Sequence, residues 1–533
     1  MKPAFLTFLE ENWAGWTPFQ VAAWEALSPL FDAGQDRAQV GLLRGYAGTG
    51  KTHWVAQVVA FLEAMEWEVK LLTPTGRAAQ VLARRMASTQ VTVRPQTIHS
   101  CIYEIQPQDY SGQQLELFAA TRPMLADERT ITIIDEGSMV GNTKRDRKAG
   151  ASFHFGSGSL LHDLLESIDL RASTDHRILF VGDGAQLPPV GDATEATPAL
   201  TVAGLQAALA DVGCRTEVLS AELRTIVRQE EGSLKAFIGS VRSVLESGED
   251  LPRRAVEDVQ PIESSRLMEA FCEAIDYGAA PARAVILAHS NKDVFHHNLA
   301  VRAALRRDDR EVMAGEVLLV KRNVNLKDFG ELEISNVFAS LKNGTFVEVV
   351  GEPQPRRSVP VVVQGEEVVL RFWSARIRVL GQEEEADVML LTNFLDPVLW
   401  LGGKEERLRR LGLLESAVLV DFQRRMQKEH GWRPARPGDD HYESYHARAK
   451  TDLYLSALRV AYGYSVTVHN AQGGEWPVVF VDPASNLARE WQHVPRHKMS
   501  FARWVYTAST RASESLYFIR RVAPVLADDE HSS

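Results

Sequence analysis

The chain contains little cysteine, no excess of basic residues and no apolar run long enough to cross a membrane. Its three cysteines, Cys101, Cys214 and Cys272, lie far apart, which excludes the short spacings of metal and iron–sulfur sites and argues against a disulfide framework. The N-terminal segment reaches Glu10 and Glu11 too soon for a signal peptide. We therefore expect a cytoplasmic protein with no membrane contact.

The formal net charge of −11 excludes a chain that is basic throughout, as many nucleic-acid-binding domains are. It does not exclude a nucleic-acid site, because a cleft lined locally with lysine and arginine binds phosphates while the outer surface stays acidic. A chain of 533 residues is also too long for one hydrophobic core, so several domains are expected.

Residues 45–52 fit the phosphate-binding loop pattern G-x-x-x-x-G-K-[ST], between an apolar strand and an amphipathic helix. In such a loop, backbone N–H groups and the start of the helix face a triphosphate. Lys51 would reach the β- and γ-phosphates, and Thr52 would hold Mg²⁺. The predicted ATP contacts in the loop are Gly45, Ala47, Gly48, Thr49, Gly50, Lys51 and Thr52.

Strands and helices alternate after this loop, which predicts an α/β fold with a parallel sheet covered on both faces. A second α/β unit begins near residue 225 and resumes at residue 453. Between its two parts lie β-rich segments and then an amphipathic helical stretch over 395–430, which predict a small β-barrel with a helical addition. The β-rich segments are 346–350, 359–363, 367–379 and 386–391.

An acidic pair, Asp135 and Glu136, follows the apolar strand 131–134. Asp135 is suited to hold Mg²⁺ beside the phosphate loop, and Glu136 to deprotonate the attacking water. The pair alone would equally suit a helix N-cap. Farther along, Gln186 lies in a Pro-containing loop after another strand, where it would sense the γ-phosphate or position the water.

Taken together, the motifs resemble those of superfamily 1 helicases of the RecD/Dda group. They follow the family order across most of the chain. The matching segments are Gln20, 45–52, 73–79, 97–100, 134–139, 182–191, 228–233, 343–344, 467–475 and 506–512.

The resemblance implies two RecA-like P-loop domains, with a small β-hairpin insertion in the first and an SH3-like β-barrel plus helical insertion in the second. The expected bounds are 1–100 and 129–222 for the first domain, 101–128 for the hairpin, 223–343 and 453–524 for the second domain, 344–452 for its insertion, and 525–533 for a disordered tail.

The same resemblance assigns roles around the nucleotide. Gln20 would read the adenine, and Glu475 would contact the ribose. Arg228 and Arg511 would reach the γ-phosphate from the second domain and stabilise transition-state charge. A surface salt bridge is the alternative for each arginine, and Arg224 is the alternative position for the first.

A DNA strand is expected to cross the strand ends of both α/β units, where helix starts favour phosphate. His469 as a packed core residue is the alternative there, and the base-stacking aromatic stays open among Trp373, Trp476 and Phe295. The predicted DNA contacts are Thr73, Pro74, Thr75, Arg77, His99, Ser100, Thr467, His469 and Asn470.

Two segments between the motifs have more than one interpretation. The hairpin predicted within 101–118 is either a wedge that splits the duplex, as the family uses it, or a plain structural hairpin. The segment 142–159 carries four basic residues, then glycines and serines. It is either a basic arm on DNA or a solvated loop.

The resemblance implies an ATP-dependent DNA helicase that moves 5′→3′ on single-stranded DNA, with ATP and Mg²⁺ as cofactors. It would act as a monomer on single strands and junctions, alongside replication, recombination or repair proteins. Three other readings stay open: a translocase that strips bound proteins without separating strands, a nucleotide-gated DNA-binding scaffold, and a motor on RNA.

Overall fold

The computed structural model describes most of the chain. The described residues are 16–31, 39–87, 91–105, 117–124, 129–143, 153–172, 175–189, 197–225, 232–248, 251, 255–307, 309–325, 340–401, 403–435, 438–483 and 495–520. Within these ranges, none of the helices combines the length and the apolar character needed to span a bilayer.

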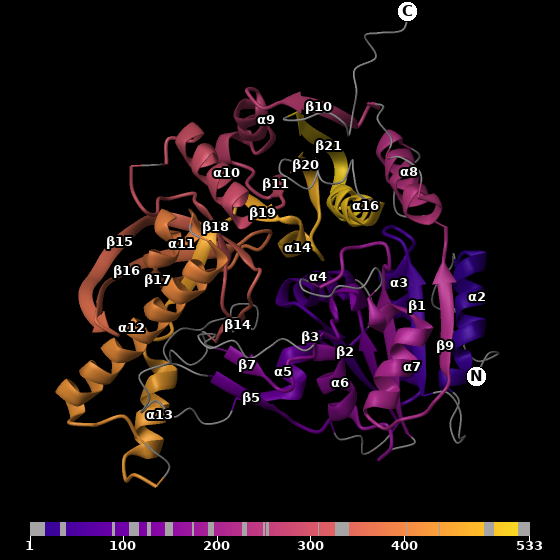
Figure 1. The fold of residues 1–533 in the computed structure, drawn as a ribbon, viewed down its shortest axis with the longest axis horizontal. Coiled ribbons are helices and arrows are strands. Elements are labelled where there is room, and N and C mark those ends of the chain that lie inside the picture. The colour runs from indigo at the N-terminus through magenta and orange to yellow at the C-terminus, as the bar shows by residue number, and fades with distance from the viewer. Residues whose placement is uncertain are drawn as a thin grey trace, which may run out of the picture.

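The first half of the chain builds a sheet of six parallel strands (Figure 1). Its central strands are apolar and buried along almost their whole length, as expected when helices cover both faces. In spatial order the strands are β3 (Gln96–Thr97), β2 (Glu68–Thr73), β6 (Thr130–Ile134), β8 (His176–Gly182), β1 (Val40–Gly45) and β9 (Val218–Leu223).

Helices and short 3₁₀ turns surround this sheet. The first helix begins with a capping box, in which Thr17 and Gln20 bond each other's backbone N–H groups. The elements are α2 (Pro18–Leu27), α3 (Lys51–Ala64), α4 (Gly76–Met86), α5 (Ile98–Ile102), α6 (Leu160–Ile168), α7 (Val202–Asp211), η1 (Ser28–Phe31), η2 (Gly137–Met139) and η3 (Pro198–Leu200).

A second parallel sheet of five strands follows, so the prediction of two parallel α/β units is confirmed. Its strands in spatial order are β10 (Val259–Glu263), β21 (Ala512–Arg520), β20 (Trp476–Asp482), β11 (Ala284–Ala288) and β19 (Ser465–Thr467). Its helices are α8 (Ser233–Ser247), α9 (Leu267–Ala274), η4 (Asp276–Gly278), α10 (Asn291–Ala304), α14 (Val468–Ala471) and α16 (Pro495–Ser509).

A closed β-barrel lies beside the second sheet. Two of its strands fall outside the predicted insertion 344–452, because a barrel must pair every edge and the flanking apolar strands β12 and β18 close it. The strands are β12 (Val317–Val320), β15 (Phe346–Val363), β16 (Glu366–Val379), β17 (Glu385–Leu391) and β18 (Leu458–Tyr462), with β13 (Val324–Asn325) and β14 (Ser340–Leu341) forming a separate pair.

The segments 346–350 and 359–363, predicted as separate, are one strand, β15. Its register against β16 shifts between Val350 and Gln354 and again between Pro355 and Arg357. Such bulges accommodate Pro353 and Pro355, which lie between the two predicted segments, within a single strand.

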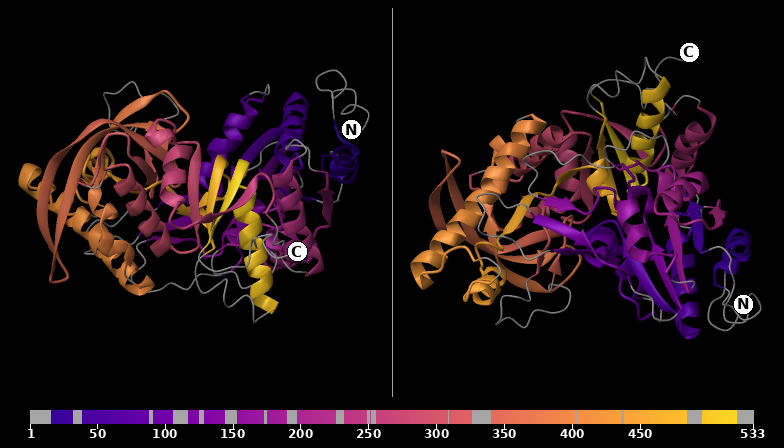
Figure 2. Two further views of the ribbon diagram at one scale, coloured as in Figure 1. Left: turned by 90° about the horizontal axis from the view of Figure 1, so that it is seen from above. Right: turned by 60° about the horizontal axis from the view of Figure 1, so that its bottom comes forward.

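The helical addition packs on the outside of the barrel, and both views in Figure 2 place it at the end of the molecule opposite α2. Apolar side chains in the middle of the long helix α12, such as Leu414 and Val418, join a core with Leu370 and Phe372 of β16. The elements are η6 (Thr392–Leu395), α11 (Pro397–Leu401), α12 (Lys404–His430) and α13 (Tyr442–Thr451).

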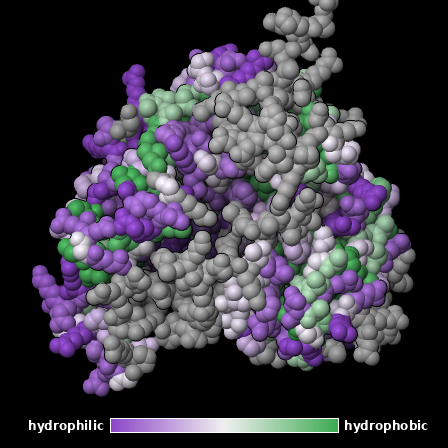
Figure 3. All heavy atoms as spheres, in the orientation of Figure 1, coloured by the Kyte–Doolittle hydropathy of each residue, from purple (hydrophilic) through white to green (hydrophobic). Residues whose placement is uncertain are grey.

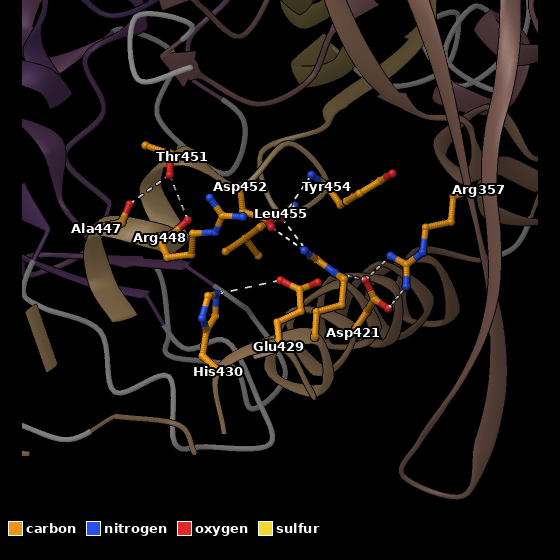
Figure 4. A network of polar contacts seen from close by, with 11 residues as sticks. Arg357, Asp421, Glu429, His430, Ala447, Arg448, Thr451, Asp452, Tyr454 and Leu455 are labelled. Carbon is orange, nitrogen blue, oxygen red and sulfur yellow. Dashed lines mark hydrogen bonds and ion pairs between the residues drawn. The ribbon is translucent and has the colours of Figure 1, made fainter. Parts of the chain in front are cut away.

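A buried charge network fixes α12 to the barrel and to the chain after α13 (Figure 4). Arg357 of β15 donates to both carboxylate oxygens of Asp421, at 2.6 and 2.7 Å. Arg425 donates to Asp421 at 3.1 Å and, by two bonds, to Asp452. Two arginines and two aspartates therefore neutralise each other where little water reaches.

Asp421→Asn is expected to destabilise the protein by about 3–5 kcal/mol, because it leaves two arginines facing each other with too little negative charge. The measurement is the shift of the urea midpoint. The control is Asp387→Asn, since Asp387 forms an exposed pair with Arg376 and should contribute under about 1 kcal/mol. Equal midpoints for the two variants would contradict the role given to the network.

A small sheet lies beside the first domain. Its strands are β4 (Tyr103–Ile105), β5 (Leu117–Thr121) and β7 (Phe153–Phe155). The antiparallel pairing of β4 with β5 agrees with the predicted hairpin, whose turn lies outside the described residues. Strand β7 was not expected: part of 142–159 joins this sheet, and the four basic residues of that segment lie outside the described residues.

Candidate nucleotide site between the two α/β domains

A pocket lies between the two α/β domains, and both contribute its walls. The first domain supplies the phosphate loop, the start of α3, one face of α4, the acidic pair and the loop after β8. The second supplies two short loops. The lining residues that the sequence singled out are Ala47, Gly48, Gly50, Lys51, Thr52, Asp135, Glu136, Gln186, Glu475 and Arg511.

The phosphate loop has the backbone shape that its sequence predicts. Gly48 and Gly50 take φ values of 79° and 81°, a left-handed conformation that side-chain-bearing residues rarely adopt. Gly50 precedes α3, and within the described chain no side chain caps the helix start. Lys51 Nζ donates to the carbonyls of Gly45 and Tyr46 at 2.6 and 2.8 Å. Backbone N–H groups and an ammonium thus meet where an anion would bind.

The acidic pair follows the end of β6 and lines the same pocket as the loop. Asp135 accepts a hydrogen bond from the backbone N–H of Glu136 at 2.9 Å, and Glu136 has a φ of 56°. Burial, with the charge of Glu136 second, raises the pKa of Asp135 to about 6, and Lys51 opposes this shift. A buried carboxylate whose pKa is raised in this way is stabilised by a nearby cation, so Asp135 and Thr52 fit a Mg²⁺ ion.

Gln186 also lines this pocket. The side chain is 5% exposed, and its Oε1 has no hydrogen-bond partner within the described ranges. An unsatisfied buried carbonyl oxygen is costly, which makes a polar ligand or water at this position favourable.

Arg511 brings a positive charge from the second domain. It follows α16 and is 5% exposed. Its guanidinium donates to the carbonyls of Thr507 and Gly474, both at 3.1 Å, and to the hydroxyl of Thr510 at 3.0 Å. Burial lowers its pKa, and Glu136 and Asp183 oppose that shift. Three bonds therefore fix this arginine at the pocket that Asp135 and Glu136 also line.

The first of the two predicted arginines, Arg228, lies outside the described residues. Arg224, the alternative position, forms a surface pair with Glu222 at 3.0 Å and keeps two thirds of its side chain exposed. It is not among the residues that line the pocket.

Two other predicted nucleotide contacts differ in placement. Glu475 lies at the pocket and pairs with Arg85 of α4 at 3.0 Å, so this pair bridges the two domains. Gln20 does not reach the pocket lining, because its side chain completes the capping box at Thr17 and is 2% exposed. Local capping chemistry explains Gln20 without a nucleotide.

A tyrosine that the sequence reasoning gave no role, Tyr506 of α16, connects the domains at the phosphate loop. Its hydroxyl accepts from the backbone N–H of Ala47 at 3.1 Å and donates to Asp183 at 2.8 Å. The next residue, Thr507, accepts from the N–H of Leu187 at 2.9 Å. The only sequence signal was its place inside the matched segment 506–512.

Tyr506→Phe is expected to lower kcat for ATP hydrolysis about tenfold, because it removes a hydrogen bond to a charged group worth about 1.5 kcal/mol. The measurement is steady-state hydrolysis with single-stranded DNA, separating kcat from KM. Tyr517→Phe is the control, since Tyr517 packs against Phe480 by its ring. An unchanged kcat in the Tyr506 variant would remove the coupling role.

The predicted DNA contacts lie mostly where strands end and helices begin. The predicted contacts Thr75 and Thr467 cap the helices that follow them, α4 and α14. Thr97, which was not a predicted contact, caps α5 beside His99 and Ser100. Asn470 is exposed, and His469 is partly buried, with its pKa lowered by burial. The remaining contacts in the first domain, Thr73, Pro74, His99 and Ser100, lie on the same two strand-to-helix junctions.

Arg77 was predicted to contact DNA, but its side chain packs against aromatic rings of other segments. Its guanidinium lies over the rings of Trp476 and Phe346, 4.2 and 4.6 Å from their centres, in the seam between the domains. Burial lowers its pKa to about 9. Its position at a helix start suggested phosphate, but aromatic residues far along the chain fold against it. Trp476 and Phe295 are buried, and Trp373 is partly buried.

Two family models match parts of the chain. Residues 28–150 match an AAA domain, and residues 462–519 match a UvrD-like helicase C-terminal domain. A comparison with curated proteins gives no match.

Several solved Pif1 helicases are similar to this chain at low identity. The Bacteroides enzyme in complex with ADP-AlF3 and ssDNA is 14% identical, with 94% of this chain and 92% of that chain covered and a TM-score of 0.40. The Candida albicans enzyme is 13% identical, with 96% of both chains covered and a TM-score of 0.40. A structure of two coordinating Pif1 helicases on forked dsDNA is 13% identical over 96% and 93%, with a TM-score of 0.43.

The two matched segments lie on opposite sides of the pocket, one with the phosphate loop and the acidic pair, the other with Glu475 and Arg511. The chain thus carries one segment that matches an AAA domain and one that matches a UvrD-like helicase C-terminal domain, in agreement with the helicase resemblance of its motifs.

Proposed function

We propose that this protein is an ATP-dependent DNA helicase that translocates 5′→3′ on single-stranded DNA. One observation carries the proposal: Arg511, from the UvrD-like domain, lines the same pocket as Lys51, Asp135 and Glu136 of the AAA domain. A nucleotide site shared by two domains ties hydrolysis to their relative motion. The polarity comes from the resemblance to the RecD/Dda group.

In the proposed mechanism Lys51 binds the β- and γ-phosphates of ATP, and Thr52 and Asp135 would hold Mg²⁺, which neutralises phosphate charge. Glu136 accepts a proton from the attacking water, and Gln186 orients that water. Arg511 stabilises the charge that develops on the γ-phosphate oxygens. Arg228 would be the second such group.

Translocation follows from the connections between the two domains. Thr507 and Gln472 bond the backbone N–H and carbonyl of Leu187, next to Gln186. A change at the nucleotide therefore reaches the second domain, where Thr467, His469 and Asn470 would hold the strand. Opening and closing of the seam would alternately tighten the grip of each domain. The β4–β5 hairpin is the candidate wedge.

Unwinding of tailed duplexes tests the proposal. We expect ATP-dependent separation of a DNA duplex with a 5′ single-stranded tail, and none for the 3′-tailed or the blunt duplex. The same substrates in RNA measure strand chemistry. Unwinding only from the 3′ tail would contradict the polarity. ATP hydrolysis and protein displacement without strand separation would favour the translocase instead.

A further inference from the structure

The outer end of the helical addition is basic in an otherwise acidic protein. We call residues 424–435 and 438–450 the helical arm: the last turns of α12, the described part of the connection after it and most of α13. The arm contains six lysines and arginines against four acidic residues, while the whole chain has a net charge of −11. Figure 3 shows hydrophilic side chains over the lower left, where Figure 1 places α12 and α13.

The cations of the arm differ from those at the start of the same helix. There, Arg409 and Arg410 pair with Glu406 at 2.8 and 2.5 Å. In the arm, within the described part of the chain, five exposed cations form no ion pair. These five are Arg424, Lys428, Arg433, Arg448 and Lys450. Exposed positive charge without a partner is available for an external anion.

The arm is held rigidly enough to present these charges in a fixed arrangement. Asp421 and Arg425, one face of α12, are bound into the buried network with Arg357 and Asp452 (Figure 4). Phe422, Met426, Ala435 and Tyr445 form a small core between α12 and α13. Beyond that core, the ring of Trp432 stacks on His430 and His441, at 4.4 and 6.1 Å.

From these charges and this rigidity we propose that the helical arm binds the phosphate backbone of the DNA duplex ahead of the motor, an inference that rests on the proposed helicase function. The single strand is expected to follow the strand ends of the two α/β sheets, whereas the arm lies outside both sheets, below the barrel in Figure 1. A duplex is stiff over about 150 base pairs, so it reaches a site displaced from the motor.

The test is a variant with Arg424→Gln, Lys428→Gln, Arg448→Gln and Lys450→Gln. The dissociation constant for a 5′-tailed duplex should rise at least about tenfold at low salt. The slope of log Kd against log salt should fall by about 2–4, near one for each phosphate that the variant no longer neutralises. Affinity for the bare single strand, and its stimulation of ATP hydrolysis, should stay as in the wild type. Arg409→Gln with Arg410→Gln, the paired arginines, is the control.

An unchanged salt slope on the tailed duplex would overturn the proposal, and so would an equal loss on the bare single strand, which would place that strand on the arm. Loss of affinity in the control variant would also overturn it, since paired charges would then act as unpaired ones do. If the wild type hydrolyses ATP on single strands but the arm variant binds the tailed duplex as tightly as the wild type, the arm proposal fails and the proposed function stays intact. A wild type that binds no DNA contradicts that function itself.

Discussion

Lys51→Ala is expected to abolish ATP hydrolysis and unwinding and to leave DNA binding largely intact. This result is expected if the loop at 45–52 binds the phosphates of ATP. Lys51 Nζ lies against the loop carbonyls of Gly45 and Tyr46, within the pocket that also holds Asp135 and Glu136. Losing a preorganised charge at the γ-phosphate costs at least about 10²–10³ in kcat.

The measurement is the steady-state rate of phosphate release with saturating single-stranded DNA, together with the Kd for the same strand. Lys70→Ala is the control, because Lys70 lies in the same domain on β2 and pairs with Glu68 at 3.4 Å. Normal unwinding of a tailed duplex by the Lys51 variant would show that the loop is misassigned.

Arg511→Ala is expected to lower kcat by about 10³–10⁵ while ATP binding stays within a few-fold of the wild type. The side chain is fixed by Gly474, Thr507 and Thr510, so its charge is oriented before ATP arrives. Arg511→Lys should rescue little, because an ammonium does not reproduce the planar fork of the guanidinium.

The measurement pairs single-turnover hydrolysis with the affinity for a fluorescent ATP analogue. Arg520→Ala is the matched control, since Arg520 lies on β21 of the same domain in a surface pair with Glu263. A thermal melt of each variant separates misfolding from impaired catalysis. A normal hydrolysis rate in a folded Arg511→Ala protein would remove the second domain from the chemistry.

The sequence predicted the parts of the site that local pattern determines. The phosphate loop sets its own backbone shape through Gly48 and Gly50, and the acidic pair follows from a buried strand that ends beside it. The two parallel sheets followed from the alternation of apolar strands and helices. The position of Arg511 at the nucleotide was predicted from the family motif alone, because no residue near it in the sequence indicates which residues it faces.

Contacts between segments that are far apart in the chain could not be predicted from the sequence. Arg77 packs on the rings of Trp476 and Phe346, and Tyr506 forms a hydrogen bond with Ala47. In each case the partners lie hundreds of residues apart in the sequence. Closure of the barrel likewise depends on the pairing of β12 with β18, which cannot be predicted from the sequence of either strand alone. Gln20 shows the opposite case, since a local capping box with Thr17 accounts for its side chain, and its role at the adenine stays a prediction.

A crystal structure with Mg²⁺ and a non-hydrolysable ATP analogue on single-stranded DNA tests most directly that both domains share one hydrolysis site. It should show the Arg511 guanidinium at hydrogen-bond distance, about 2.7–3.1 Å, from a γ-phosphate oxygen, with Lys51 on the opposite side. A γ-phosphate bound only by the first domain, with Arg511 turned toward solvent, would contradict it.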